Sequence, residues 1–315
     1  MNNQSSNIGT FRCFSAALIA AGACCLALWS ATCAAQAGPA ERLTVSALKN
    51  TSYSGIQDIG GPVRLQAGTW QGRPPMPGSA SVPRVDFLGR LAARGDLTGD
   101  GIEEAAVLLA SNFGGSGVFL HVAIVGQQGS GLRNLDTRFV GDRIQVRDLR
   151  IESGQVVLDV VRAGPNDPSC CPTEVVSLRM RMTGGHLGAA EQVGPASRLS
   201  LNTLSGPTWR LASWNDSEPA PDGLTLSYAG GQFQGTAACN GYSASVRAPS
   251  ADQTLEVGLP RSTRKMCEQE QMVAEQRFLG LLTKVNRFWF DASRLALPYG
   301  QGSDAGVMLF ERSDR

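Results

Sequence analysis

Histidine is scarce in this chain of 315 residues, which contains only His121 and His186. This scarcity argues against most metal-dependent hydrolases and most acid–base mechanisms, because such sites rely heavily on histidine. Net charge is also nearly absent: it is +1 overall, and removing Arg12 with the first 37 residues brings it to 0. A neutral protein has no overall electrostatic basis for binding nucleic acid or an anionic membrane surface.

Short motifs of common catalytic sites are missing as well. There is no H-E-x-x-H, no phosphate-binding loop, no G-x-G-x-x-G before a helix and no C-x-x-C. Residues 114–118, GGSGV, fail the nucleophile-elbow pattern at its last position, and the S-x-x-K patterns at 46–49 and 262–265 have no K-T-G partner. His121 lies in a strongly apolar run, so we interpret it as a hydrogen-bonded core residue. We therefore predict that the protein is not an enzyme.

The N-terminal segment, residues 1–37, has the pattern of a secretory signal. An apolar run at 14–29 follows Arg12, and residues 35–37 form the A-x-A pattern that a signal peptidase accepts. A retained membrane anchor would need about 20 apolar residues, and a lipoprotein would be cleaved before a cysteine such as Cys33. The pattern favours cleavage after residue 37 and a periplasmic or secreted mature chain without a membrane span. Anchoring through Cys33 is the alternative.

Cleavage would divide the eight cysteines into two groups of four. One group leaves with the signal, and the mature chain keeps Cys170, Cys171, Cys239 and Cys267. An even number of cysteines in an oxidising compartment indicates disulfide bonds. Four cysteines allow three connectivities, and the sequence alone does not select one.

The first part of the mature chain, residues 38–195, is predicted to be an antiparallel β domain, because short apolar runs alternate with Gly, Pro and Asp and no long 3.6-residue period interrupts them. Glycine-rich residues 112–117 and the pair Ser153-Gly154 are the expected hairpin turns. Residues 184–206, rich in small side chains, are expected to form a linker. Strands are expected at 105–110, 118–125, 143–149, 155–161 and 174–182.

The rest of the chain, residues 196–315, is predicted to be an α+β domain. Its one helix, at 268–285, carries Met272, Phe278, Leu279, Leu282 and Val285 between polar residues. The predicted fold class is therefore mostly β, with two domains, antiparallel sheets and a single amphipathic helix in the second domain. Strands are expected there at 208–214, 224–228, 232–236, 242–247, 254–259, 287–290, 294–297 and 307–311.

Three motifs in order mark the second domain: TWRL at 208–211, ACNGY at 238–242, and STRKMC at 262–267 before the helix. This series resembles the META/HslJ-type domain, whose pattern is W-x-L, then G-C-N, then T-x-x-x-C; here Ala238 replaces the usual glycine. The resemblance implies a small α+β domain of bacterial envelope proteins, linked to stress or antibiotic tolerance. It supplies no catalytic residues, and lipid or peptide binding enters only by analogy.

Two cysteine pairs can be considered from the residues themselves. A bridge between Cys239 and Cys267 would pin the sheet to the start of the helix, with a stabilisation of about 3–4 kcal/mol in the chain-entropy model; two buried thiols are the alternative. Cys170 and Cys171 lie between prolines and could form a strained vicinal bridge, which would be structural or redox-active. Cross-domain pairing is the third arrangement. Asn240 is expected to hydrogen-bond turn backbone rather than a ligand.

One loop of the first domain has cation-binding character. Residues 95–104, GDLTGDGIEE, place Asp96, Thr98, Asp100 and Glu104 around a glycine turn, and such oxygen ligands suit calcium. Val107 occupies the position where an EF-hand has its bidentate glutamate. The alternative is a tight turn in which the aspartates accept hydrogen bonds from backbone N–H groups. This D-x-T-x-D-G loop also resembles one in an uncharacterised module of exported bacterial proteins.

These observations favour an exported, non-enzymatic bacterial envelope protein that binds a ligand or partner and contributes to envelope stress or antibiotic tolerance. The partner would be an envelope protein, a lipid or a peptide, and not nucleic acid. Two other hypotheses remain. One is a secreted hydrolase that depends on carboxylates or calcium at residues 96–104, and the other is a purely structural protein in which the first domain presents the second.

Overall fold

The computed structural model describes residues 42–74, 76, 78, 81–168, 170–249 and 254–313. Within them the chain is mostly antiparallel β, as predicted, with the helices α1 (Val45–Leu48) and α2 (Gln269–Leu282) and the 3₁₀ turns η1 (Leu201–Leu204) and η2 (Gly302–Asp304). In this part of the chain no helix is long and apolar enough to cross a membrane. The predicted signal, residues 1–37, lies outside the described residues and stays a prediction.

The first sheet has the order β3-β4-β5-β6-β7, and β1 and β2 form a separate pair. The apolar runs predicted to be adjacent strands are β5 and β6, which pair antiparallel with Ala110 opposite Leu120. Ala106 and Leu108 join a core shared with buried residues between 146 and 180, whereas Val107 joins one shared with α1, β1 and β2. Both faces of β5 are therefore buried, which explains its uninterrupted apolar run. The strands are β1 (Ser52–Tyr53), β2 (Val63–Arg64), β3 (Thr69–Gln71), β4 (Arg84–Gly95), β5 (Glu104–Asn112), β6 (Phe119–Gln128) and β7 (Gly131–Asp142).

The second sheet contains β8 (Gln145–Glu152), β9 (Gln155–Arg162), β10 (Glu174–Thr183), β11 (His186–Leu187) and β12 (Glu191–Arg198). Ser153 and Gly154 form the predicted turn between β8 and β9. Both have positive φ, 50° and 70°, which a two-residue type I′ hairpin requires.

The linker expected at 184–206 is wrong in part, because β11 and β12 lie within it and both pair with β10. All eight residues of β12 are exposed, so the strand has no apolar alternation from which it could be recognised. The predicted boundary between 195 and 196 falls inside β12. The division into two domains stays a prediction.

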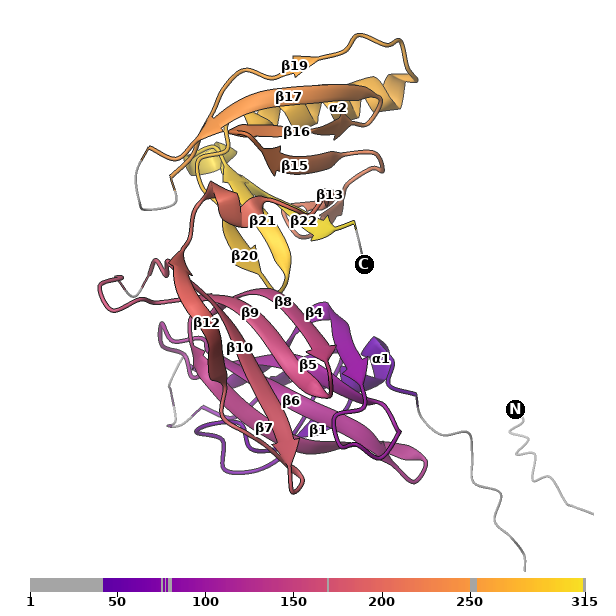
Figure 1. Ribbon diagram of the computed structural model, residues 1–315, viewed down its shortest axis with the longest axis vertical. Helices are drawn as coiled ribbons and strands as arrows, with labels where there is room; N and C mark the ends of the chain where they lie inside the picture. The colour runs from indigo at the N-terminus through magenta and orange to yellow at the C-terminus, as the bar shows by residue number, and fades with distance from the viewer. Residues whose placement is uncertain are drawn as a thin grey trace, which may run out of the picture. The chain divides into compact units, whose positions relative to one another are not determined.

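The remaining described strands form the third sheet, with the order β18-β17-β16-β15-β13-β22-β21-β20, β14 beside β13 and β19 beside β17. Figure 1 labels all of these strands except β14 and β18. The backbone N–H of Leu255 donates to the carbonyl of Asn286 at 2.8 Å, so the segments that precede β18 and β20 approach each other. The strands are β13 (Trp209–Trp214), β14 (Glu218–Pro219), β15 (Thr225–Ala229), β16 (Gln232–Ala237), β17 (Asn240–Arg247), β18 (Glu256–Val257), β19 (Arg261–Ser262), β20 (Trp289–Asp291), β21 (Arg294–Tyr299) and β22 (Gly306–Arg312).

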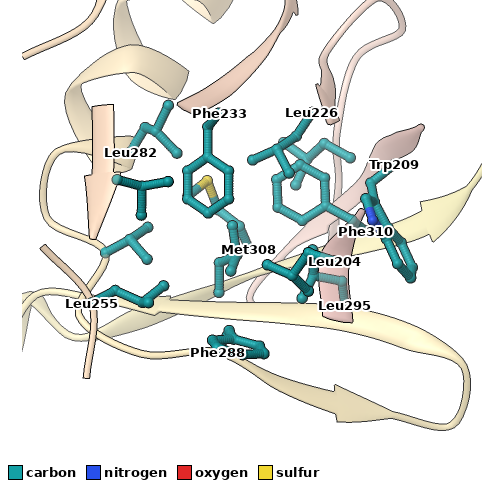
Figure 2. Close-up of a cluster of buried hydrophobic side chains, with 14 of the residues drawn as sticks. Leu204, Trp209, Leu226, Phe233, Leu255, Leu282, Phe288, Leu295, Met308 and Phe310 are labelled. Carbon is teal, nitrogen blue, oxygen red and sulfur yellow. The ribbon is translucent and has the colours of Figure 1, made fainter. Parts of the chain in front are cut away.

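Side chains from these strands and from α2 form a packed core (Figure 2). Phe278 of α2 packs edge-on against Tyr242 of β17, with ring centroids 5.4 Å apart, and against Phe310 of β22 at 6.4 Å. Phe233 and Leu282 are also fully buried. The interior of this part of the molecule is therefore filled by its own aromatic and aliphatic side chains.

Candidate functional site

In the loop that precedes β5, the aspartates predicted to bind calcium accept hydrogen bonds from backbone N–H groups. Asp96 accepts hydrogen bonds from the N–H groups of Gly99 at 2.6 Å and Gly101 at 2.9 Å. These bonds hold the pKa of the Asp96 carboxyl below its usual range, because they favour the charged form. Asp100 likewise accepts from the N–H of Ile102 at 2.8 Å.

Glu104, the fourth predicted calcium ligand, is almost fully buried and turned toward the same loop. Its carboxylate accepts from the N–H of Leu97 at 2.9 Å and of Thr98 at 3.2 Å. Across the described residues, no group of three or more His, Cys, Asp or Glu is arranged to hold a metal ion. This geometry is that of the tight turn weighed as the alternative, and calcium binding stays a prediction.

His121 of β6 is fully buried. Its Nε2 accepts a hydrogen bond from the backbone N–H of Gln57 at 3.2 Å, and its Nδ1 lies 3.1 Å from the carbonyl oxygen of Phe119. The neutral ring with the proton on Nδ1 satisfies both contacts. Burial lowers the pKa of the imidazole, and this environment fits the predicted role in the core.

Cys170 and Cys171 lie in the loop between β9 and β10, with Cys170 exposed and Cys171 partly buried. Asp167 fixes one side of this loop by accepting from the N–H groups of Gly164 at 2.8 Å and Thr173 at 2.6 Å. These bonds lower the pKa of the Asp167 carboxyl. The vicinal bridge stays a prediction.

The motifs of the C-terminal part meet at the beginning of β17. Cys239 and Cys267 lie at disulfide distance, with their Cα atoms 6.4 Å apart. The bond joins the turn between β16 and β17 to the residue two positions before α2. This is one of the bridges considered from the sequence, and it ties the sheet to the start of the helix.

Asn240 is the polar centre beside this bond, and 4% of its surface is exposed. Its side-chain oxygen accepts from the hydroxyl of Thr263 at 2.7 Å and from the N–H of Lys265 at 2.8 Å. Its amide nitrogen donates to the carboxylate of Glu275 on α2 at 2.8 Å. Asn240 thus holds backbone, as expected, and its partners come from two segments distant in the sequence.

Residues 258–267, which we call the β19 segment, run along the outer edge of β17 between β18 and α2. The N–H groups of Gly258 and Thr263 donate to the carbonyls of Ser245 and Gly241 at 2.8 and 3.0 Å. β19 pairs with β17 between these two bonds. The segment is thus attached to the sheet along its length, and at its end by Asn240 and the Cys239–Cys267 bond.

The β19 segment carries the two most exposed large apolar side chains of the described residues, together with three exposed cationic ones. Leu259 is 86% exposed and Met266 is 94% exposed. Arg261, Arg264 and Lys265 lie between them and are exposed as well. The sequence placed this segment in a strand and a motif, but it could not show that the side chains point into solvent.

A shallow hollow adjoins the segment on the outer face of the sheet. It is lined largely by small and polar residues of β15, β16, β17 and β19, among them Ser227, Gln234, Gly241, Ser243 and Thr263. Because the core beneath is packed, the hollow is an open depression in the surface rather than an enclosed apolar cavity. The region suits contact with another surface better than enclosure of a small apolar ligand.

Comparison with known proteins supports the resemblance in this part of the chain. Residues 202–314 match the family model of the META domain. An NMR structure of a protein from Burkholderia xenovorans is 21% identical, with 40% of this chain and 95% of that chain covered and a TM-score of 0.30. No match was found among curated proteins. The resemblance predicted for the N-terminal part receives no support from these comparisons.

Proposed function

Because the C-terminal third of the chain is a META domain, we propose that the protein is an exported, non-enzymatic envelope protein that binds a partner through the β19 segment. The A-x-A pattern at residues 35–37 supports export. A role in envelope stress or antibiotic tolerance is the part of the proposal that rests on family resemblance alone.

One observation carries the binding role: Leu259 and Met266 are held in solvent on a segment that the fold restrains. Side chains of this kind more commonly bury their carbon atoms, so two of them held in solvent on either side of three cations form the feature of this domain best suited to meet a partner. The Cys239–Cys267 bond and Asn240 restrain the backbone before any partner arrives. Binding would therefore cost little additional conformational entropy.

The proposal includes no enzymatic role because the polar groups best suited to chemistry are bound to the protein's own backbone. Asp96, Glu104 and His121, the residues best suited to chemistry in the N-terminal part, are used by backbone N–H groups. Asn240 is used in the same way in the META domain. Groups that satisfy the fold's own donors are not positioned for a substrate.

Fractionation of bacterial cells that express the tagged full chain tests export and binding together. We expect the protein outside the cytoplasm, with Gly38 as its first residue by mass spectrometry and with much of it sedimenting with the envelope. The double variant Leu259→Ser/Met266→Ser should move into the soluble extracytoplasmic fraction, because it removes the exposed apolar contacts without disturbing the core.

The matched control is Ile102→Ser/Val118→Ser, which removes two exposed apolar side chains (54% and 43%) far from the META domain in sequence. It should sediment like the unaltered protein. Retention of Met1 in a cytoplasmic protein would contradict export. Equal sedimentation of the two double variants would contradict binding through the β19 segment.

A further inference from the structure

We propose that the partner of the β19 segment is an anionic lipid surface, on which the META domain docks with Leu259 and Met266 inserted and the cations between them on the headgroups. This inference rests on the proposed function and names the partner of the same segment. It concerns contact at the surface of the domain, since the core is packed with the domain's own side chains.

Charge is the first argument. Residues 258–267 contain Arg261, Arg264 and Lys265 and no acidic residue. In the part of the chain that the structure describes, none of these three side chains forms an ion pair. The neighbouring Arg247, by contrast, pairs with Glu256 between β17 and β18. Unpaired cations beside exposed apolar groups are the combination that binds anionic headgroups.

The near-zero net charge of the whole chain is compatible with binding of the β19 segment to an anionic surface. Many arginines elsewhere are neutralised by bound carboxylates: Arg277 pairs with Glu218 at 2.5 Å, for example, and Arg162 with Glu174 at 2.6 Å. Glu268 and Glu270 follow the segment at the start of α2, so the cationic stretch ends at Cys267. The positive charge of the β19 segment therefore becomes visible only when the charges of this segment are counted separately from those of the whole chain.

Shape is the second argument. Residues 258–263 lie alongside residues 241–245 of β17 in extended form, and five steps of a strand span about 17 Å. Leu259 lies near one end of this extended stretch, and Met266 follows beyond the other. A broad surface offers contact along this whole length, whereas a pocket on a globular partner would meet only a part of it.

Restraint is the third argument. Thr263 and Lys265 are bound to the buried Asn240, and Cys267 is bound to Cys239. The cations and the two apolar side chains are thus presented from a fixed backbone. Reduction of the Cys239–Cys267 bond should loosen the end that carries Met266 and weaken docking.

Flotation of the purified protein with lipid vesicles tests the inference. We expect binding to vesicles of phosphatidylglycerol mixed with phosphatidylcholine, little binding to pure phosphatidylcholine, and loss of binding as salt is raised. Leu259→Ser/Met266→Ser and Arg264→Glu/Lys265→Glu should each weaken binding by about tenfold or more, since each cation near an anionic surface and each buried apolar group contributes. Ile102→Ser/Val118→Ser should bind normally, and thermal melting should show that every variant is folded.

Equal binding to the two kinds of vesicle, or an equal loss in the control, would overturn the lipid assignment. If vesicles do not bind but Leu259→Ser/Met266→Ser still leaves the envelope fraction in cells, the partner is a protein; the inference then fails and the proposed function stands. If that variant changes neither measurement, both fail.

Discussion

Several of the buried and half-buried polar residues that the structure describes hold the backbone around them. Asp96 and Glu104 hold the loop before β5, Asp167 holds the loop that contains Cys170, and Asn240 holds the β19 segment. Each carboxylate or amide satisfies N–H groups that the irregular chain would otherwise leave unpaired. Residue types that suggest chemistry in a sequence can therefore be structural in the fold.

His121 leads to a prediction about pH. Burial lowers its pKa from the ordinary value of 6.5, so the unfolded chain takes up a proton at a pH where the folded protein does not. The contribution of His121 to the free energy of unfolding is constant above about pH 6.5. Below that pH the free energy of unfolding falls, by up to about 1.4 kcal/mol per pH unit. Urea unfolding at pH 7.5 and pH 5.5 should show this loss.

His121→Gln should flatten the dependence between these two pH values, because glutamine can make both hydrogen bonds and does not titrate. The matched control is His186→Gln, at a side chain that is 81% exposed. That variant should keep the pH dependence of the unaltered protein. A pH dependence that disappears in the His186 variant instead would show that the buried ring is not responsible.

At the scale of single elements, α2 illustrates how well an amphipathic helix is predicted and where the prediction stops. A helix was expected at 268–285, and α2 spans Gln269–Leu282. Phe278 and Leu282 are fully buried, as the period requires, but Met272 is 36% exposed. Val285 is buried after the helix has ended. Periodicity marks a helical face, while the depth of each contact depends on the sheet beneath it.

The strands β4 (Arg84–Gly95) and β7 (Gly131–Asp142) show the opposite case, since neither was predicted. Their residues mix Arg, Asp and Gly with apolar side chains, and β7 has only one buried residue, Thr137. These strands are defined by pairing with the apolar β5 and β6. Backbone hydrogen bonds to a neighbour leave no pattern in the strand's own sequence.

The Cys239–Cys267 bond gives a prediction at this scale. It closes a loop with a sequence separation of 28, so Cys239→Ser/Cys267→Ser should lower the free energy of unfolding by about 3–4 kcal/mol. The cause is the greater freedom of the unfolded chain. Denaturant unfolding of the oxidised protein and the variant measures the difference.

Cys170→Ser/Cys171→Ser is the matched control, because a bond between adjacent residues would close no loop of the chain. Its effect on unfolding should be small. Equal losses in the two cysteine variants would contradict the explanation by loop closure, and alkylation with mass spectrometry would show which cysteines carry thiols.

At the scale of the whole chain, the described residues belong to one compact unit, 38–315, yet its sheets are built from separate stretches of sequence. The contacts between the second and third sheets include a hydrogen bond from the N–H of Phe290 to the side chain of Gln145 at 3.0 Å and one from the N–H of Ser293 to Val146 at 2.9 Å. Arg147 also lies over the ring of Phe290, 5.4 Å from its centroid. Most of the side chains in the large core of the META domain come from the domain itself.

We therefore predict that residues 199–315 fold as an isolated fragment with a native-like circular dichroism spectrum and a cooperative melting transition. A fragment that begins at residue 206 should melt at a lower temperature, because it loses the buried side chains of Leu199, Leu201 and Leu204. Failure of the longer fragment to fold would contradict the two-domain prediction. Equal melting temperatures would show that η1 is not part of the domain's core.

What the sequence determined by itself was local: the β-rich class, most strands of the META domain, α2, the turn at Ser153-Gly154 and the family motifs. These depend on periodicity, turn chemistry and order along the chain. The tertiary structure decided what depends on residues far apart in sequence. It showed that Asn240 binds Glu275 and Lys265, that Asp96 and Glu104 serve backbone N–H groups, and which arginines are neutralised. The exposure of the β19 segment was also decided by the tertiary structure, because a side chain's access to solvent is set by its neighbours in space.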